Sequence, residues 1–123
     1  MKKTLLLLFA LFLSAFSTTS LATEPSKASQ CASYATNIYI GLKKSGQPND
    51  AWIEEMKGWK AKGATKQEVA IMMVRLSEEV MGPDSDERKR SGKPLTVEDI
   101  LKKMTVLYKD TGCVSDSTPE LKV

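Results

Sequence analysis

Apolar residues recur at spacings of three and four along most of the chain beyond residue 28, and polar residues fill the positions between them. This spacing places the apolar side chains on one face of an α-helix. It predicts helices over four ranges: 29–44, 50–62, 65–81 and 96–109. Glycine or proline follows each range closely and marks its end. Thr65 with Glu68, and Thr96 with Asp99, have the spacing of helix N-caps and indicate where the third and fourth helices begin.

The same pattern predicts an all-α protein. No stretch alternates apolar and polar residues as a half-buried strand would, and no segment repeats another. The expected architecture is a small four-helix bundle. The helix over 65–81 carries apolar residues outside its main stripe, among them Ile71 and Val74. A helix with so much apolar surface either lies at the centre of the bundle or has a second apolar partner.

The first 22 residues have the form of a secretory signal peptide. Lys2 and Lys3 precede a run over 5–16 that is apolar except for Ser14, and Ser20-Leu21-Ala22 fits the pattern of small residues around a cleavage site. The run is shorter than the roughly 20 apolar residues that a membrane-spanning helix needs. We therefore expect cleavage after Ala22, a periplasmic location and no membrane span in the mature chain. Full secretion is the alternative.

Cleavage would leave three further segments. Residues 23–28 are expected to be a flexible leader, 29–113 the helical domain and 114–123 a disordered C-terminal tail. Loss of the two lysines of the signal peptide lowers the formal net charge from +3 to +1. A chain this close to neutral has no electrostatic basis for binding nucleic acid, so no nucleic-acid partner is expected.

The two cysteines lie near the two ends of the expected helical domain. An exported chain meets an oxidising compartment, so Cys31 and Cys113 are expected to form a disulfide. A crosslink that closes a loop of roughly 80 residues stabilises a protein by about 4.5 kcal/mol in the chain-entropy model. The chain has no Cys-x-x-Cys motif, which argues against a redox enzyme.

Several classes of enzyme are excluded by composition. The chain has no histidine, so it cannot form a Ser-His-Asp or Cys-His site or bind a metal through imidazole. It also lacks a glycine-rich phosphate-binding loop. Glu54 and Glu55 are adjacent on a helix and point about 100° apart, so they cannot face each other across a glycosidase cleft. They are interpreted as a solvated helix face. We expect no enzymatic activity, no cofactor and no metal site.

Eight side chains are candidates for contact with a protein partner. Ile71 and Val74 would form an apolar patch. The segment over 83–94 is dense in charge, and four of its residues would form a polar rim: Asp84, Asp86, Arg88 and Arg90. Trp52 and Trp59 share one stripe of the helix over 50–62, where two indoles are either core or a contact surface. A homodimer through the helix over 65–81 is an alternative use of its apolar face.

These features favour a small exported binding protein that acts by occluding a protein partner in the cell envelope, as an immunity protein or inhibitor does. The alternatives are a periplasmic stress or acid chaperone and an accessory subunit of an envelope complex. In size, export, helix content and cysteine number the chain resembles helical immunity proteins that neutralise cell-wall amidases of rival cells. It is similar in the same respects to small periplasmic acid chaperones with one disulfide. Both resemblances are analogies of architecture, and both imply a protein partner.

Overall fold

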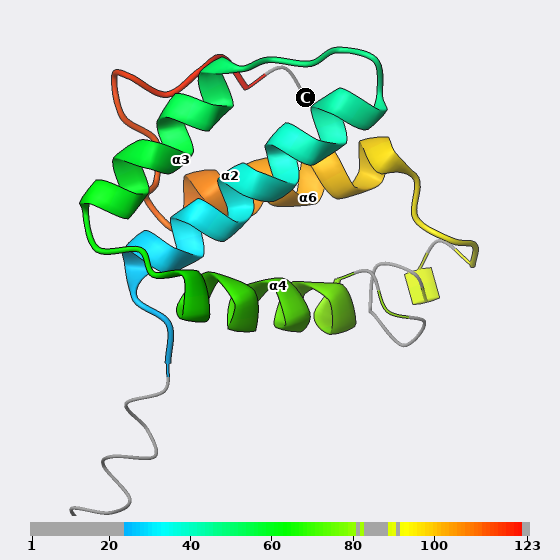
Figure 1. Cartoon of the computed structure of the whole chain (residues 1–123). Helices are drawn as coiled ribbons and strands as arrows, with labels where there is room; N and C mark the ends of the chain where they lie inside the picture. The colour runs from blue at the N-terminus through cyan, green and yellow to red at the C-terminus, as the bar shows by residue number, and fades with distance from the viewer. Residues whose placement is uncertain (1–23, 81, 83–88, 91, 122–123) are drawn as a thin grey trace, which may run out of the picture.

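Helices make up most of the structure (Figure 1), a computed structural model that describes residues 24–80, 82, 89–90 and 92–121. The four long ones are α2 (Lys27–Lys44), α3 (Ala51–Ala61), α4 (Lys66–Glu79) and α6 (Val97–Asp110). The described part contains no strand, so the all-α prediction is confirmed. The expected signal peptide lies outside the described residues.

The helix ends lie close to the predicted bounds, although α2 begins earlier than expected and α4, with Val80 as its C-cap, ends earlier. α2 begins at Lys27, two residues earlier than expected, because the Ser26 side chain accepts a hydrogen bond from the backbone N–H of Ser29. Ser26 therefore caps a helix at a position where the sequence predicts a flexible leader. At the start of α6, Thr96 and Asp99 form the reciprocal capping box that their spacing indicates.

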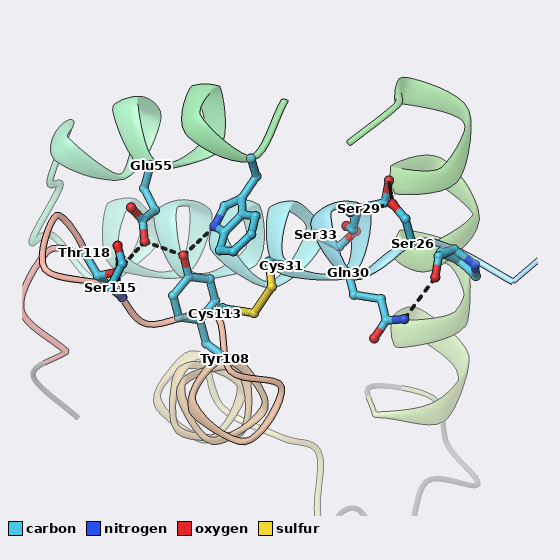
Figure 2. The surroundings of a disulfide bond; sticks show 12 residues. Ser26, Ser29, Gln30, Cys31, Ser33, Glu55, Tyr108, Cys113, Ser115 and Thr118 are labelled. Atoms are coloured by element: carbon cyan, nitrogen blue, oxygen red, sulfur yellow. Dashed lines mark hydrogen bonds between the residues drawn. A yellow bond between two sulfur atoms is a disulfide. The ribbon is translucent and has the colours of Figure 1, made fainter. Parts of the chain in front are cut away.

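The end of α6 determines where the second cysteine lies. Gly112 has a φ of 77°, a conformation that glycine adopts without strain. The Gly112 N–H donates to the Lys109 carbonyl at 3.0 Å, and the Cys113 N–H donates to the Tyr108 carbonyl at 3.0 Å. This Schellman arrangement turns the chain back toward α2 at once. Cys113 thereby reaches Cys31, with Cα atoms 5.7 Å apart, and the predicted disulfide is confirmed (Figure 2).

The centre of the bundle is α2. It packs against α3, α4 and α6, whereas these three make no comparable contact with one another. Figure 1 shows α2 between α3 and α4, with α6 behind it. Small buried residues let three neighbours approach α2 closely: Ser29, Ala32, Ser33, Ala35 and Gly41. The first interpretation of the helix over 65–81, as the central helix, is therefore wrong, because α4 lies at the edge and packs on α2.

The core gathers where α2, α3 and α6 meet. Trp52 of α3 is completely buried, and its ring and the Tyr108 ring form a T-shaped pair with centroids 5.5 Å apart. The remaining buried apolar side chains come from α2, α4, α6, the residue after α4 and the disulfide: Tyr34, Ala35, Ile38, Met72, Leu76, Val80, Leu101, Met104, Cys31 and Cys113. One apolar core thus extends from the disulfide to the inner face of α4.

Gly41 and Gly58 provide a matched test of this packing. A Cβ atom on Gly41 would lie 2.7 Å from Cδ2 of Leu101, whose side chain is itself buried, whereas a Cβ atom on Gly58 would meet nothing within 4 Å. We expect Gly41→Ala to lower the free energy of unfolding by about 1–2 kcal/mol through overpacking. Gly58→Ala should raise it by about 0.5–1 kcal/mol through helix propensity. Urea unfolding followed by circular dichroism measures both, and equal signs would contradict the close approach of α2 and α6.

Candidate functional site

The predicted apolar patch lies on the outer side of α4. Val74 is 59% exposed and Ile71 is partly buried, while Met72 and Leu76 on the opposite side of the helix pack into the core. Ile71 stands one helical turn before Arg75, so the two share a side of α4. The patch is therefore available at the surface and adjoins a charged residue.

The predicted charged rim can be located only in part. Arg90 is exposed, and Asp84, Asp86 and Arg88 lie outside the described residues. Their role in binding stays a prediction.

The two tryptophans of α3 have different environments. Trp52 is fully buried, so its assignment as a contact residue is corrected to a core residue. Trp59 is half-buried, and its indole N–H donates to the Tyr108 hydroxyl at 2.7 Å. The Lys62 ammonium lies 4.6 Å from the centroid of the Trp59 ring, within cation–π distance. Trp59 thus remains accessible in part, although lysine covers one of its faces.

A hollow of about 360 Å³ separates α4 from α6 above the α2 surface. Five apolar side chains form its floor: Tyr34, Met72, Leu76, Val80 and Leu107. Charged and polar side chains form its rim: Glu24, Gln30, Arg75, Glu79 and Lys103. Across the rim, Arg75 Nη1 bonds to Glu24 Oε1 at 3.1 Å. This feature, called the α4–α6 hollow below, was not predicted, although Arg75 and Glu79 flank the apolar stripe of α4 at a spacing of four.

The start of α4 is joined to the start of α2 through one carboxylate. Glu68 accepts hydrogen bonds from the hydroxyl of Ser29 at 2.9 Å and from the hydroxyl and backbone N–H of Ser26 at 3.2 Å each. These bonds, the one from Ser29 most of all, hold the pKa of Glu68 below its ordinary value of 4.5. The capping box predicted at Thr65 is completed through Ser29. The Thr65 N–H donates to the Ser29 hydroxyl, which in turn donates to the Glu68 carboxylate.

A polar cluster lies at the other end of the core (Figure 2). The Tyr108 hydroxyl donates to Glu55, and the Thr118 hydroxyl donates to the same carboxylate oxygen at 2.7 Å. Glu55 is only 9% exposed, so the interpretation of Glu54 and Glu55 together as a solvated face is wrong for Glu55. Glu54 is exposed and pairs with Lys57. The spacing in the sequence indicates this burial, because Glu55 lies three residues after Trp52 and four before Trp59, on the same face of the helix.

Burial makes this cluster a structural anchor. Desolvation, reinforced by the hydrogen bond to Glu55, raises the pKa of Tyr108 far above its usual value. The phenol therefore stays protonated and remains a hydrogen-bond donor at neutral pH. Both partners of the phenol, Glu55 and Trp59, come from α3, and Thr118 of the segment after α6 joins the cluster through Glu55.

The segment after α6 is where the sequence predicts a disordered tail. In the structure, residues 114–121 pass beside α3 (Figure 1). The Ser115 N–H donates to the Thr118 hydroxyl at 2.8 Å, and the Thr118 N–H donates to the Ser115 carbonyl at 3.1 Å. This turn brings the Thr118 hydroxyl to Glu55.

No family model matches the chain, and no significant similarity to a curated protein or to a solved structure is found. Of the helices that the structure describes, none is long and apolar enough to cross a membrane. The function must therefore be inferred from the surfaces of this chain.

Proposed function

We propose that this protein is an exported binding protein without catalytic activity that occludes a protein partner of the cell envelope through the surface formed by α4 and α6. The observation that carries the proposal is the α4–α6 hollow, whose apolar floor is surrounded by charged side chains. Interfaces between proteins commonly have this anatomy, with an apolar centre and a polar rim.

The chemistry of the hollow favours a partner helix that inserts a bulky apolar side chain. An amphipathic helix binds in a groove by placing its apolar residues on the floor and its charged residues along the sides. The rim offers both signs of charge for such a helix, with Glu24 and Glu79 as acids and Arg75 and Lys103 as bases. Val74 lies on the opposite side of α4 from the floor residues Met72 and Leu76, so it is outside this contact.

The scaffold supports the same role. The disulfide joins α2 to the segment after α6, and α4 packs on α2. The two sides of the hollow, α4 and α6, are therefore both attached to α2. A surface that is ordered before binding loses less conformational entropy when the partner arrives. A disulfide is also the crosslink expected of a chain that matures in an oxidising compartment.

Site-specific photocrosslinking tests this proposal in cells that express the protein. The photoreactive residue p-benzoylphenylalanine is placed at position Glu79, which is exposed and lines the hollow, and, as a control, at exposed Lys60 of α3. We expect a discrete adduct with another envelope protein from position Glu79, none from position Lys60, and loss of the adduct when Arg75→Glu reverses a rim charge. The proposal fails if position Glu79 gives no adduct, gives the same adducts as position Lys60, or links only two copies of this chain.

A second candidate function, an acid-activated chaperone, is favoured by the way α4 is attached. α4 packs on α2 at the edge of the bundle, and Glu68 ties its first turn to Ser26 and Ser29. Because the folded pKa of Glu68 is lowered, its hydrogen bonds contribute full stability above its ordinary pKa of 4.5. That contribution is lost as the pH falls through the folded value. Acid would thus loosen α4 and expose its apolar face.

The chaperone role predicts hydrophobic dye binding at pH 3 and none at pH 7. It also predicts that Glu68→Gln reduces the difference in unfolding free energy between these two pH values, because the titrating group has been removed. Glu78→Gln, at an exposed position on the same helix, is the control and should leave the difference unchanged. Urea unfolding at both pH values provides the measurement. A chain that binds no dye at pH 3 would exclude this function.

A further inference from the structure

One oxygen of the buried Glu55 carboxylate has no partner among the described residues. The Tyr108 and Thr118 hydroxyls both donate to Oε2, and Figure 2 shows no bond at the other oxygen, which is turned away from the Tyr108 ring. Two donors on one oxygen suit the ionised carboxylate, which only accepts. No ion pair within the described residues reaches Glu55, although its side chain is only 9% exposed. A buried charge without a counter-charge costs free energy, so this oxygen lacks a cation.

The unbonded oxygen, Oε1, is open to solvent. Two buried side-chain polar atoms of the described residues have neither solvent contact nor a partner, and these are Trp52 Nε1 and Thr105 Oγ1. Glu55 Oε1 also lacks a partner but is not one of the two, so it retains accessible surface. Glu55 lines a pocket of about 210 Å³ beside α3. This pocket is therefore the space through which a ligand can reach Oε1.

The pocket lies between α3 and the segment after α6. Gly58 lines it from α3, and a Cβ atom on Gly58 would meet nothing within 4 Å, so the space near Glu55 is open. Ser115 and Ser117 line it from the segment after α6, and their hydroxyls can accept hydrogen bonds. A cavity of roughly 150 Å³ can hold benzene, so this pocket has room for a short aliphatic molecule.

The charges of the lining favour a cation. Glu54 and Glu55 contribute two carboxylates, whereas Lys62 contributes one ammonium. The Lys62 Nζ lies 4.6 Å from the centroid of the Trp59 ring, which shows that the pocket wall accommodates an ammonium beside an aromatic ring. Glu54 is paired with Lys57, so the unpaired negative charge of the pocket belongs to Glu55.

We propose that this pocket binds a small aliphatic primary ammonium ion, whose N–H groups donate to Glu55 Oε1 and whose carbon chain lies beside Gly58 and Trp59. An ammonium has three donors, so it can also bond to the serine hydroxyls of the lining. Hydrogen bonds between an ammonium and a carboxylate are stronger than those between neutral groups. The pocket shares no residue with the α4–α6 hollow, so the site and its test are independent of the proposed partner surface.

The test compares n-butylammonium with n-butanol, which has nearly the same shape without the charge. NMR of the oxidised protein at pH 7 follows the indole N–H of Trp59, which lines the pocket. Trp52, which does not line it, is the internal reference, and Trp59→Phe assigns the two resonances. We expect butylammonium to shift the Trp59 resonance saturably and to bind at least about tenfold more tightly than butanol, because hydrogen bonds to charged groups are the stronger ones.

Variants then test the carboxylate. Glu55→Gln keeps the shape of the side chain and should weaken butylammonium binding at least about tenfold. Glu98→Gln, at an exposed position of α6, removes the same charge far from the pocket and should change binding by less than about twofold, because solvent and salt screen it. If Glu55→Gln fails to fold, Gly58→Leu decides, since it keeps the carboxylate, fills the open space and should abolish binding.

Three results would overturn the proposal. The first is a Trp59 resonance that responds to neither probe, and the second is equal affinity for butylammonium and butanol. The third is a variant at Glu55, or in its place at Gly58, that binds butylammonium as tightly as Glu98→Gln does.

Discussion

Replacing Cys31 and Cys113 together by alanine is expected to lower the free energy of unfolding by about 4.5 kcal/mol. The disulfide spans a sequence separation of 82 residues, and the chain-entropy model gives about this value for a loop of that size. Both sulfur atoms are buried in the core, so the variant also loses packing at the junction of α2 and α6. Small domains are usually stable by only about 5–15 kcal/mol, so this loss would remove a large fraction of the total.

Urea unfolding at pH 7, followed by circular dichroism, measures this loss. Two controls separate the crosslink from the side chains. The wild-type protein in reducing buffer should lose a similar amount of stability, and the alanine variant should be insensitive to reductant. A loss below about 1 kcal/mol in both would mean that the unfolded chain is already restricted without the crosslink.

The disulfide was predictable because it depends on features that are local or unique in the sequence. Two cysteines allow one intramolecular pairing, and the periodicity of the helices placed them at opposite ends of one domain. The same locality explains the success of the helix predictions, since Thr96 and Asp99 act within a single turn. Capping and periodicity are properties of neighbouring residues, and a single sequence displays them directly.

The packing order was not predictable from such local signals. The central role of α2 follows from its small buried residues, which matter only when three helices approach at once. Apolar content left two possibilities for the helix over 65–81, a central position or a second apolar partner, whereas α4 lies at the edge of the bundle with Val74 exposed. α2 can be the central helix because its neighbours approach it closely, as α6 does where Leu101 packs against Gly41.

The candidate sites were missed for a related reason, because they join segments that are distant in sequence. The bonds of Glu55 reach 53 residues along the chain to Tyr108 and 63 residues to Thr118. The α4–α6 hollow arises because two helices pack on α2 without packing on each other. Polar residues near the chain ends, such as Ser26 and Thr118, are typical of flexible segments. Their hydrogen bonds to Glu68 and Glu55 depend on residues far away in the sequence.

The second large effect is expected from Tyr108→Phe. The Tyr108 hydroxyl is at the centre of the cluster, where it accepts from the Trp59 N–H and donates to Glu55. Its removal would leave Glu55 with the Thr118 hydroxyl and would deprive the Trp59 N–H of its acceptor. Hydrogen bonds to charged groups contribute about 1.5–3 kcal/mol, and an unpaired buried group costs a similar amount. We therefore expect the free energy of unfolding to fall by about 2–3 kcal/mol.

Tyr34→Phe is the matched control for this change. Tyr34 is also buried in the core, but within the described residues its hydroxyl has no hydrogen-bond partner, and it lines the α4–α6 hollow. Removing that hydroxyl should change stability by less than about 0.5 kcal/mol. Urea unfolding of both variants at pH 7 gives the comparison, and the Trp59 indole resonance should shift only in Tyr108→Phe. Equal stability of the two variants would contradict the anchoring role of the cluster, because burial of the ring is common to both and only the hydrogen bonds differ.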